Sequence, residues 1–542
     1  MKRLSTTLAV AALLASVPMA QSTEPVDLDA IAKIRAQGMD NSQVMDHLFW
    51  LTDRYGPRLT GSPQTEEAAD WVIQTLEDWG LQNVRKERFE FGKGWELTGF
   101  HATMTEPRVM PIIGMPKAWS SGTSGTVTAE VVRPEIANAQ EAEAWRGKLR
   151  DKVVLTQPAR EVRMLEGRLV LRMTDEEIEE ALAPPAPRGG GARAGGGGRG
   201  GGRGGRGGGR GGGRGAATEE RFDLDAFYKA EGVVALFDRG SNSDTSAGGS
   251  NLSWRTQRTD GGTVFVGSGG SRTAEAAGTG LPEVTLAVEH YNRMVRLLEH
   301  DVPVTVELDI GVRFHDEPAG GNAFNILGEL PGTDLADEIV LIGGHFDSWH
   351  GATGATDNAT GNAAMMEVLR IFKDAGLQPR RTVRIALWGA EEQGLIGSRQ
   401  YAATYLGTPE APGPEHAKTT AYFNIDNGTG RIRGIWLEGN MAVAPIFGAW
   451  IAPLEDLGVE ILGPRSVGST DHASIDRTGV PGFQFVQERL EYNSRSHHSN
   501  MDFYDRVQAE DMRISATAAA VFAWHAANRD GLLPRKPAGG GQ

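Results

Sequence analysis

The stretch DEIVLIGGHFDSWHGATGATDNATG, residues 337–361, indicates the fold class of this chain. It begins with a short apolar run that is typical of a buried strand, and it continues as a glycine-rich loop that contains His345 and Asp357. In open α/β sheets, ligands bind beyond the carboxyl ends of the parallel strands. Polar residues directly after a strand therefore predict a functional loop at the edge of a sheet.

The residues after this loop alternate between helical patterns and short apolar runs. Helix, strand, helix and strand patterns occur in turn at 361–376, 381–390, 398–406 and 419–426. This alternation predicts an α/β fold with a mostly parallel sheet flanked by helices. Upstream, Ser62 as N-cap and Pro63 at the first helical position predict an amphipathic helix that ends at Gly80.

The composition limits the classes of function. The chain has 542 residues, which is too long for one ordinary core, so we expect two folded units. It contains no cysteine, so a metal ion would have to bind histidine, aspartate or glutamate. The formal net charge of −15 disfavours nucleic acid as a main partner.

The first residues, 1–20, have the pattern of a cleaved signal peptide. Lys2 and Arg3 precede an apolar stretch of about ten residues, and small residues lie near Ala20. No later segment offers about twenty uninterrupted apolar residues, so we expect no membrane span. The sequence therefore predicts an exported protein, either periplasmic or secreted.

The middle of the chain predicts an inserted α+β domain at 121–315. Strand patterns occur at 147–160 and 231–240, and Thr174 and Glu177 have the spacing of a capping box that begins a helix. The main α/β unit would then consist of 27–120 and 316–531, followed by a disordered tail at 532–542.

Residues 188–214 interrupt this predicted domain with a different composition. They contain seven arginines, many glycines and no acidic residue, so they cannot supply a packed core. We expect a disordered insert, and binding of a polyanion is the alternative for this segment.

Candidate metal ligands follow several of the predicted strands. His345 follows the first apolar run, Glu391 and Glu392 follow the run at 381–390, and Asp426 ends the run at 419–426. Asp357 and the pair His497-His498 complete the set. Each of these features is weak alone, but carboxylate and imidazole groups at the ends of three strands are the ligands that zinc prefers.

Five motifs resemble, in the same order, those of the co-catalytic two-zinc exopeptidases, a family that includes bacterial leucyl aminopeptidases and plasma glutamate carboxypeptidase. They are GGHFDS (343–348), ATDNATG (355–361), WGAEEQGLIGS (388–398), FNIDN (423–427) and HHSNMD (497–502). The resemblance covers essentially the whole mature chain and implies the zinc exopeptidase fold. The placement of the inserted domain is similar to that of the protease-associated domain of several exported peptidases.

The resemblance also implies a site with two Zn²⁺ ions per chain. His345 and Asp426 would bind one ion, Glu392 and His498 would bind the other, and Asp357 would bridge the two. The Asp357-Asn358 peptide is expected to be cis, and Asn358 stands where some relatives have a second aspartate.

Two further carboxylates receive catalytic roles. Glu391 is not needed as a ligand, so it can accept the proton of the attacking water and pass it to the leaving amine. Asp347 has the position of a carboxylate that orients the metal-binding His345 and fixes its tautomer.

The sequence thus predicts a metallo-exopeptidase of the aminopeptidase or dipeptidase type that hydrolyses peptides near a free N-terminus with water activated by two metal ions. A zinc glutaminyl cyclase and a catalytically silent receptor on the same fold are the alternatives. Side-chain specificity and oligomeric state stay open, a homodimer included. The roles of five residues also stay open: His350, with a position near the substrate as its best interpretation, and Asp471, His472, Tyr492 and His497.

Overall fold

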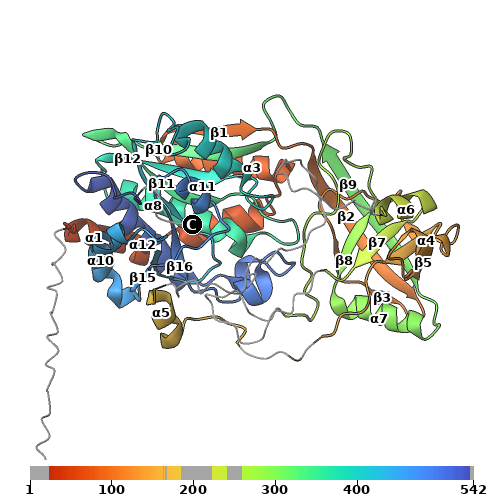
Figure 1. The fold of residues 1–542 in the computed structure, drawn as a ribbon. Coiled ribbons are helices and arrows are strands. Elements are labelled where there is room, and N and C mark those ends of the chain that lie inside the picture. Colours follow the sequence, from red (N-terminus) through yellow and green to blue (C-terminus); the bar gives the residue numbers. More distant parts are fainter. Residues whose placement is uncertain (1–23, 163, 165–167, 185–221, 241–258, 538–542) are drawn as a thin grey trace, which may run out of the picture.

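The computed structural model describes residues 24–162, 164, 168–184, 222–240 and 259–537 and contains two lobes, each built around its own eight-stranded sheet (Figure 1). The predicted signal peptide and the segment 188–214 lie outside the described residues. Within the described ranges, no helix is both long enough and apolar enough to cross a membrane.

The sheet of the main lobe is parallel in its centre, as the sequence predicts. Neighbouring strands across the sheet are β1 (Gln82–Phe89), β10 (Ala323–Leu330), β12 (Arg381–Trp388), β11 (Leu335–His345), β13 (Thr419–Asn424), β16 (Gly482–Gln487), β14 (Ile432–Trp436) and β15 (Ile461–Gly463). Strands β12, β11, β13 and β16 run parallel. Strands β1 and β10 pair in antiparallel fashion with their neighbours, and β14 is antiparallel to β16 but parallel to β15. The four parallel strands are buried, which explains their continuous apolar runs.

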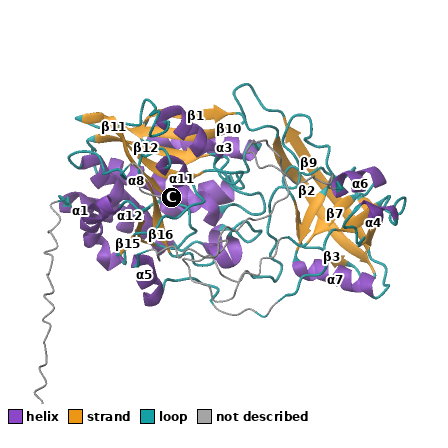
Figure 2. Cartoon of the chain, in the orientation of Figure 1, coloured by secondary structure: helices purple, strands orange, loops and turns teal. Residues whose placement is uncertain are grey.

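Helices cover both faces of this sheet (Figure 2). One large core is shared by α1 (Leu28–Arg35), α2 (Val44–Phe49), α3 (Pro63–Asp78), α8 (Thr360–Asp374), α10 (Ala444–Ile451) and α12 (Ala509–Asn528). A smaller core on the other face includes residues of α9 (Ile396–Tyr401) and α11 (His472–Asp476). Helix α3 begins as predicted, because the Ser62 hydroxyl accepts the Thr65 N–H.

The second lobe begins earlier in the chain than the sequence predicts. Its strands, in spatial order, are β3 (Met110–Pro111), β2 (Gly94–Glu106), β9 (Thr305–His315), β5 (Val127–Val132), β6 (Lys152–Leu155), β7 (Ala235–Asp238), β8 (Glu283–Leu286) and β4 (Gly114–Pro116). Helices α4 (Ala139–Glu143), α6 (Leu224–Glu231) and α7 (Val288–Glu299) complete it. The boundary moves from 121 to the start of β2, because β2 pairs along its whole length with the distant strand β9.

One helix of the predicted insert packs on the main lobe instead. Helix α5 (Asp175–Leu182) begins with the predicted capping box of Thr174 and Glu177. The apolar cluster beneath it combines Met173 and Ala181 with residues of the main sheet: Trp436, Ile461 and Val486. Part of the insert is therefore built into the main lobe.

An apolar cluster also joins the two lobes. Trp95 and Trp119 of the second lobe are buried with Leu59, Phe89 and Ala323 of the main lobe. The two sheets are thus connected by a packed interface as well as by the chain.

The end of the chain is ordered further than predicted. Leu533 is 2% exposed and its N–H donates to the Thr420 hydroxyl at 3.0 Å, while Lys536 lies 2.6 Å from Asp476. The predicted disorder is therefore wrong for residues 532–537. An apolar residue in the tail, Leu533, was the signal that could have indicated this packing.

Candidate metal centre

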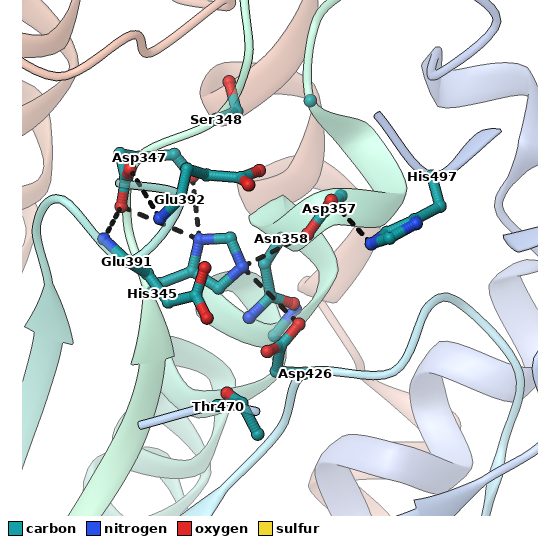
Figure 3. A network of polar contacts seen from close by, with 12 residues as sticks. His345, Asp347, Ser348, Asp357, Asn358, Glu391, Glu392, Asp426, Thr470 and His497 are labelled. Carbon is teal, nitrogen blue, oxygen red and sulfur yellow. Dashed lines mark hydrogen bonds and ion pairs between the residues drawn. The ribbon is translucent and has the colours of Figure 1, made fainter. Parts of the chain in front are cut away.

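Three neighbouring strands deliver acidic and histidine side chains to one edge of the main sheet (Figure 3). His345 is the last residue of β11, Glu391 and Glu392 follow β12, and Asp426 follows β13. Asp357 reaches the same place from the loop between β11 and α8. The carboxyl ends of these parallel strands therefore form the site that the sequence predicts.

The first group of ligands surrounds His345. Its Nε2 lies 3.1 Å from Asp357 Oδ1 and 3.4 Å from Asp426 Oδ1. Its Nδ1 lies 2.9 Å from the carbonyl oxygen of Asp347, which can only accept a hydrogen bond, so Nδ1 carries a proton. In neutral His345, Nε2 consequently has a lone pair that faces two carboxylates.

The second group surrounds His498. Its Nε2 lies 2.9 Å from Glu392 Oε2 and 3.3 Å from Asp357 Oδ2. The His497 ring stacks on that of His498 with centroids 3.8 Å apart, but its Nε2 is 3.9 Å from Asp357. The distances favour His498 as the ligand, and Asp357 directs one oxygen to each group.

Both groups fit metal ions. Buried carboxylates that face imidazole lone pairs need a positive charge between them. Glu392 Oε1 is buried and, among the described residues, has no hydrogen-bond partner. Glu392 lines a small open cavity together with Trp349, Asp357 and His498. Two divalent ions that share Asp357 would satisfy these oxygens.

The pKa values of His345 and His498 also indicate that the site favours bound positive charge. Burial opposes charge on His345, but the carboxylates of Asp426, Asp347 and Asp357 outweigh it and raise its pKa well above the usual value. Burial likewise opposes charge on His498, yet Glu392 and Asp357 raise its pKa to about 10. The site therefore binds positive charge strongly, and protons can supply it where metal ions do not.

Asp347 plays a different part from the one predicted. Its carboxylate is 3.7 Å from His345 Nδ1, and its backbone carbonyl accepts the ring N–H instead. The carboxylate accepts the backbone N–H of Glu391 at 3.0 Å, that of Glu392 at 3.4 Å and the Thr60 hydroxyl at 3.0 Å. Asp347 thus orients His345 through its main chain and fixes the Glu391-Glu392 turn through its side chain.

Glu391 has the surroundings of a proton acceptor. Burial raises the pKa of its carboxyl well above the usual value; the charge of His345 opposes this shift, and the charges of Asp426, Asp471 and Glu392 add to it. A carboxylate with a raised pKa takes up a proton more readily than an exposed one.

A buried arginine that the sequence did not single out holds the loop that carries the candidate ligands His345 and Asp357. Arg58 is fully buried and donates to the carbonyl oxygens of Phe346 at 2.8 Å, Thr353 at 3.1 Å and Gly354 at 3.0 Å. Its position just before α3, in the stretch YGPRLTGS, gave no local signal of this contact. The guanidinium ties together both ends of the loop between His345 and Asp357.

Asp357 is itself held by an acid from the HHSNMD motif. Asp502 accepts the backbone N–H groups of Thr356 at 2.6 Å and Asp357 at 3.2 Å. The Asp357-Asn358 peptide is cis, as the resemblance implies. Asn358 donates to the carbonyl of Ile425 at 2.8 Å, which ties the loop to the residue before Asp426.

The structure changes the interpretation of His350. Its Nε2 contacts the carbonyl of Pro116 at 2.7 Å, its ring lies edge-on to Trp95 at 5.0 Å, and burial lowers its pKa to about 4. His350 therefore connects the two lobes, and its expected position near the substrate stays a prediction.

The other three open residues border the site in different ways. His472 is buried and contacts the carbonyl of Val467 at 3.0 Å and Glu438 at 3.3 Å, which is a structural role. Asp471 is buried and its burial raises its pKa to about 7. Tyr492 is buried with its ring 4.6 Å from that of His497.

Comparison with known proteins identifies this arrangement. Residues 325–523, which include all the candidate ligands, match the description Peptidase family M28. This part of the chain is similar to peptidase family M28. The whole chain is 25% identical to mouse carboxypeptidase Q over 510 residues, which cover 93% of this chain and 90% of the relative.

Solved structures have a similar fold over most of the chain. A peptidase M28 precursor from Shewanella amazonensis has a TM-score of 0.62 at 24% identity, with 94% of this chain and 98% of that chain covered. A zinc aminopeptidase from Bacillus subtilis has a TM-score of 0.50 at 16% identity, with 90% and 95% covered. The predicted α/β zinc exopeptidase fold is confirmed, and so is the predicted enzyme class, a metallo-exopeptidase. The likeness of the second lobe to a protease-associated domain stays a prediction.

Proposed function

We propose that this protein is an exported two-zinc exopeptidase that hydrolyses the peptide bond next to a free N-terminus. The observation that carries the proposal is the orientation of Asp357, whose Oδ1 lies 3.1 Å from His345 and whose Oδ2 lies 3.3 Å from His498. One carboxylate between two groups of ligands suits a pair of ions about 3.5 to 4 Å apart.

The described residues divide into two ligand groups with one shared member. His345 and Asp426 would hold one zinc ion, Glu392 and His498 the other, and Asp357 would contact both. When bound, two zinc ions would polarise the scissile carbonyl and lower the pKa of water at the site.

Glu391 supplies proton transfer. Its carboxyl accepts a proton from the attacking water and then delivers it to the nitrogen of the leaving amine, so that the peptide bond breaks and both products leave in stable protonation states. The Asp347 carboxylate holds the backbone of Glu391 at 3.0 Å, which keeps the proton acceptor beside the ligands. The raised pKa of Glu391 favours retention of the proton until the amine departs.

The preference for a free N-terminus follows from the charge of the site. Asp357 and Glu392 line a small cavity, with Glu391 and Asp426 close by, and carboxylates favour a nearby ammonium or amine over an acylated nitrogen. Residues 1–20 support export, because their composition is that of a signal peptide.

A pair of matched peptides tests this function. A short peptide and its N-acetylated form are incubated with the enzyme at equal concentration, with and without a chelator, and products are identified by mass spectrometry. We expect residues to be released stepwise from the free N-terminus of the unmodified peptide and no cleavage of the acetylated peptide. With chelator, we expect no cleavage of either peptide. Equal cleavage of the two peptides would contradict the N-terminal preference, and activity that survives exhaustive metal removal would contradict the zinc mechanism.

A further inference from the structure

The loop that carries His498 is held from outside the main sheet. Two segments of the predicted insert, 169–173 and 259–266, lie against residues 488–500, and we call them the clasp segments. Each forms an antiparallel bridge with the loop, Leu171 with Leu490 and Phe265 with Ser499.

The second clasp segment contacts the ligand residue itself. Val266 N–H donates to the carbonyl of His498 at 2.8 Å. Asn500, two residues later, makes three further hydrogen bonds: its backbone N–H donates to Val264 O at 3.0 Å, its Oδ1 accepts the Val264 N–H at 2.7 Å, and its Nδ2 donates to Gly262 O at 3.1 Å. Four hydrogen bonds therefore fix the backbone from 498 to 500.

The backbone of His498 needs such support. Its φ is +56°, a left-handed conformation that residues with a Cβ adopt only when the surroundings stabilise it. The bond from Val266 to the His498 carbonyl and the anchoring of Asn500 both follow this angle in the chain. They set the direction in which the imidazole points toward Glu392 and Asp357.

The first clasp segment secures the base of the same loop. Leu171 and Leu490 exchange backbone hydrogen bonds at 2.8 and 3.3 Å, and Arg172 lies 2.5 Å from the buried Glu488. Ser494 contacts both segments, because its hydroxyl donates to Leu169 O at 2.7 Å and its carbonyl accepts the Thr259 N–H at 2.7 Å.

The other ligand group is supported differently. His345 ends the central strand β11, its carbonyl accepts a hydrogen bond from Asn362 of α8 at 2.7 Å, and Asp426 follows the neighbouring strand β13. These supports all belong to the main lobe. His345 and Asp426 thus rest on contacts of the main lobe, whereas His498 also contacts the clasp segments, and Asp357 is shared by both groups.

We propose that Asn500 is a positioning residue for His498, and that the clasp makes one zinc site dependent on the insert. The proposal rests on the two-zinc function argued above. Loosening the clasp weakens the ion held by Glu392 and His498, while the ion held by His345 and Asp426 keeps its affinity.

Zinc titration of Asn500→Ala tests this dependence. Zinc is added to the metal-free full chain in competition with a chromophoric chelator, so that each of two dissociation constants is measured without reference to activity. Loss of a supporting contact outside the ligand set typically costs 10- to 100-fold in metal affinity. We therefore expect one constant to rise by about 10- to 100-fold and the other to stay within about threefold of wild type.

Asn440→Ala is the control. Asn440 is also buried and its Nδ2 donates to the carbonyl of Pro534 at 2.7 Å, but it lies between β14 and α10 of the main lobe. Both of its zinc constants should equal those of wild type. Asn500→Asp is isosteric and keeps the acceptor for Val264, so it provides the comparison if the alanine variant fails to fold, with a smaller selective loss expected.

Three outcomes separate the proposals. Two unchanged constants in the Asn500 variants, or equal weakening of both, would overturn the role of the clasp while leaving the two-zinc function intact. The same selective loss in Asn440→Ala would also overturn it, because the effect would then not require contact with the loop. Fewer than two zinc ions bound by wild type would instead overturn the proposed function itself.

Discussion

Glu391 and Glu392 are neighbours in the sequence, yet their surroundings differ. Glu392 Oε2 lies 2.9 Å from His498 Nε2. Burial and the negative charges of Asp426 and Asp471 raise the pKa of Glu391. Their turn is fixed by one carboxylate, that of Asp347. Adjacent acids can therefore serve as ligand and proton acceptor without exchanging roles.

Substitution separates these two roles. Glu391→Gln is nearly isosteric but cannot accept a proton, so we expect kcat to fall by about 10²- to 10⁴-fold with zinc content unchanged. Glu392→Gln is the matched control and should lower zinc content, because the amide is a poor zinc ligand. Activity and elemental analysis of both purified variants provide the measurement. The reverse pattern would mean that the two assignments are exchanged.

The pKa values predict how stability depends on pH when zinc is removed. His498 has a pKa of about 10 in the folded chain against an ordinary value near 6.5, and Glu392 about 7 against about 4.5. For both groups the folded state binds the proton more tightly, so the stabilisation is complete at low pH and is lost as pH rises through the folded pKa.

Chelated protein should therefore unfold at a lower temperature at pH 9 than at pH 6. Zinc replaces these protons and binds more tightly as pH rises, so the difference in melting temperature between loaded and chelated protein should be larger at pH 9. Thermal unfolding at both pH values, with zinc or with chelator, is the measurement. A smaller difference at pH 9 would contradict the assignment of these groups to the metal centre.

At the scale of elements, α8 and α12 place the site. Both are buried along nearly their whole length and pack together under the central strands. Phe522 of α12 is the centre of an aromatic group, with ring centroids 5.2 Å from Phe447, 5.3 Å from Phe485 and 5.9 Å from Phe423. This packing fixes β13, and with it Asp426.

Phe522→Ala should destabilise the fold by about 3 to 5 kcal/mol, because it removes a buried ring and leaves a cavity. Phe49→Ala is the control, since Phe49 of α2 is 42% exposed and its loss should cost about 1 kcal/mol or less. Denaturant unfolding of the three proteins measures both values. Equal losses would show that the aromatic group does not stabilise the sheet.

At the scale of the whole molecule, the two lobes meet beside the metal centre. His350 follows the candidate ligand His345 by five residues and contacts Pro116 of the second lobe. The clasp segments contact the loop that carries His498. Ligands from strands and loops that are far apart in the chain converge on Asp357. Zinc should therefore stabilise the entire chain.

We expect each zinc ion to add about 2.7 kcal/mol to the free energy of unfolding when free zinc is 100-fold above its dissociation constant. Calorimetry across a series of free zinc concentrations measures the rise in melting temperature. A melting temperature that does not depend on zinc would contradict binding to the folded state.

The sequence by itself determined the parallel centre of the main sheet, the start of α3, the capping box of α5 and the chemical types that gather at the strand ends. These features follow from periodicity and from residue types at short spacing, which the chain carries locally. Family resemblance added the distribution of ligands between two ions.

Only the tertiary structure decided which backbone atoms complete the site. Asp347 orients His345 through its carbonyl, Arg58 binds the loop from nearly 300 positions away in the chain, and Asn500 is anchored by Val264. The pairing of β2 with β9, and with it the boundary between the lobes, also became visible only there. Each of these contacts joins segments that no periodicity relates, because backbone N–H and carbonyl groups are the same in every residue and acquire partners only when the chain is folded.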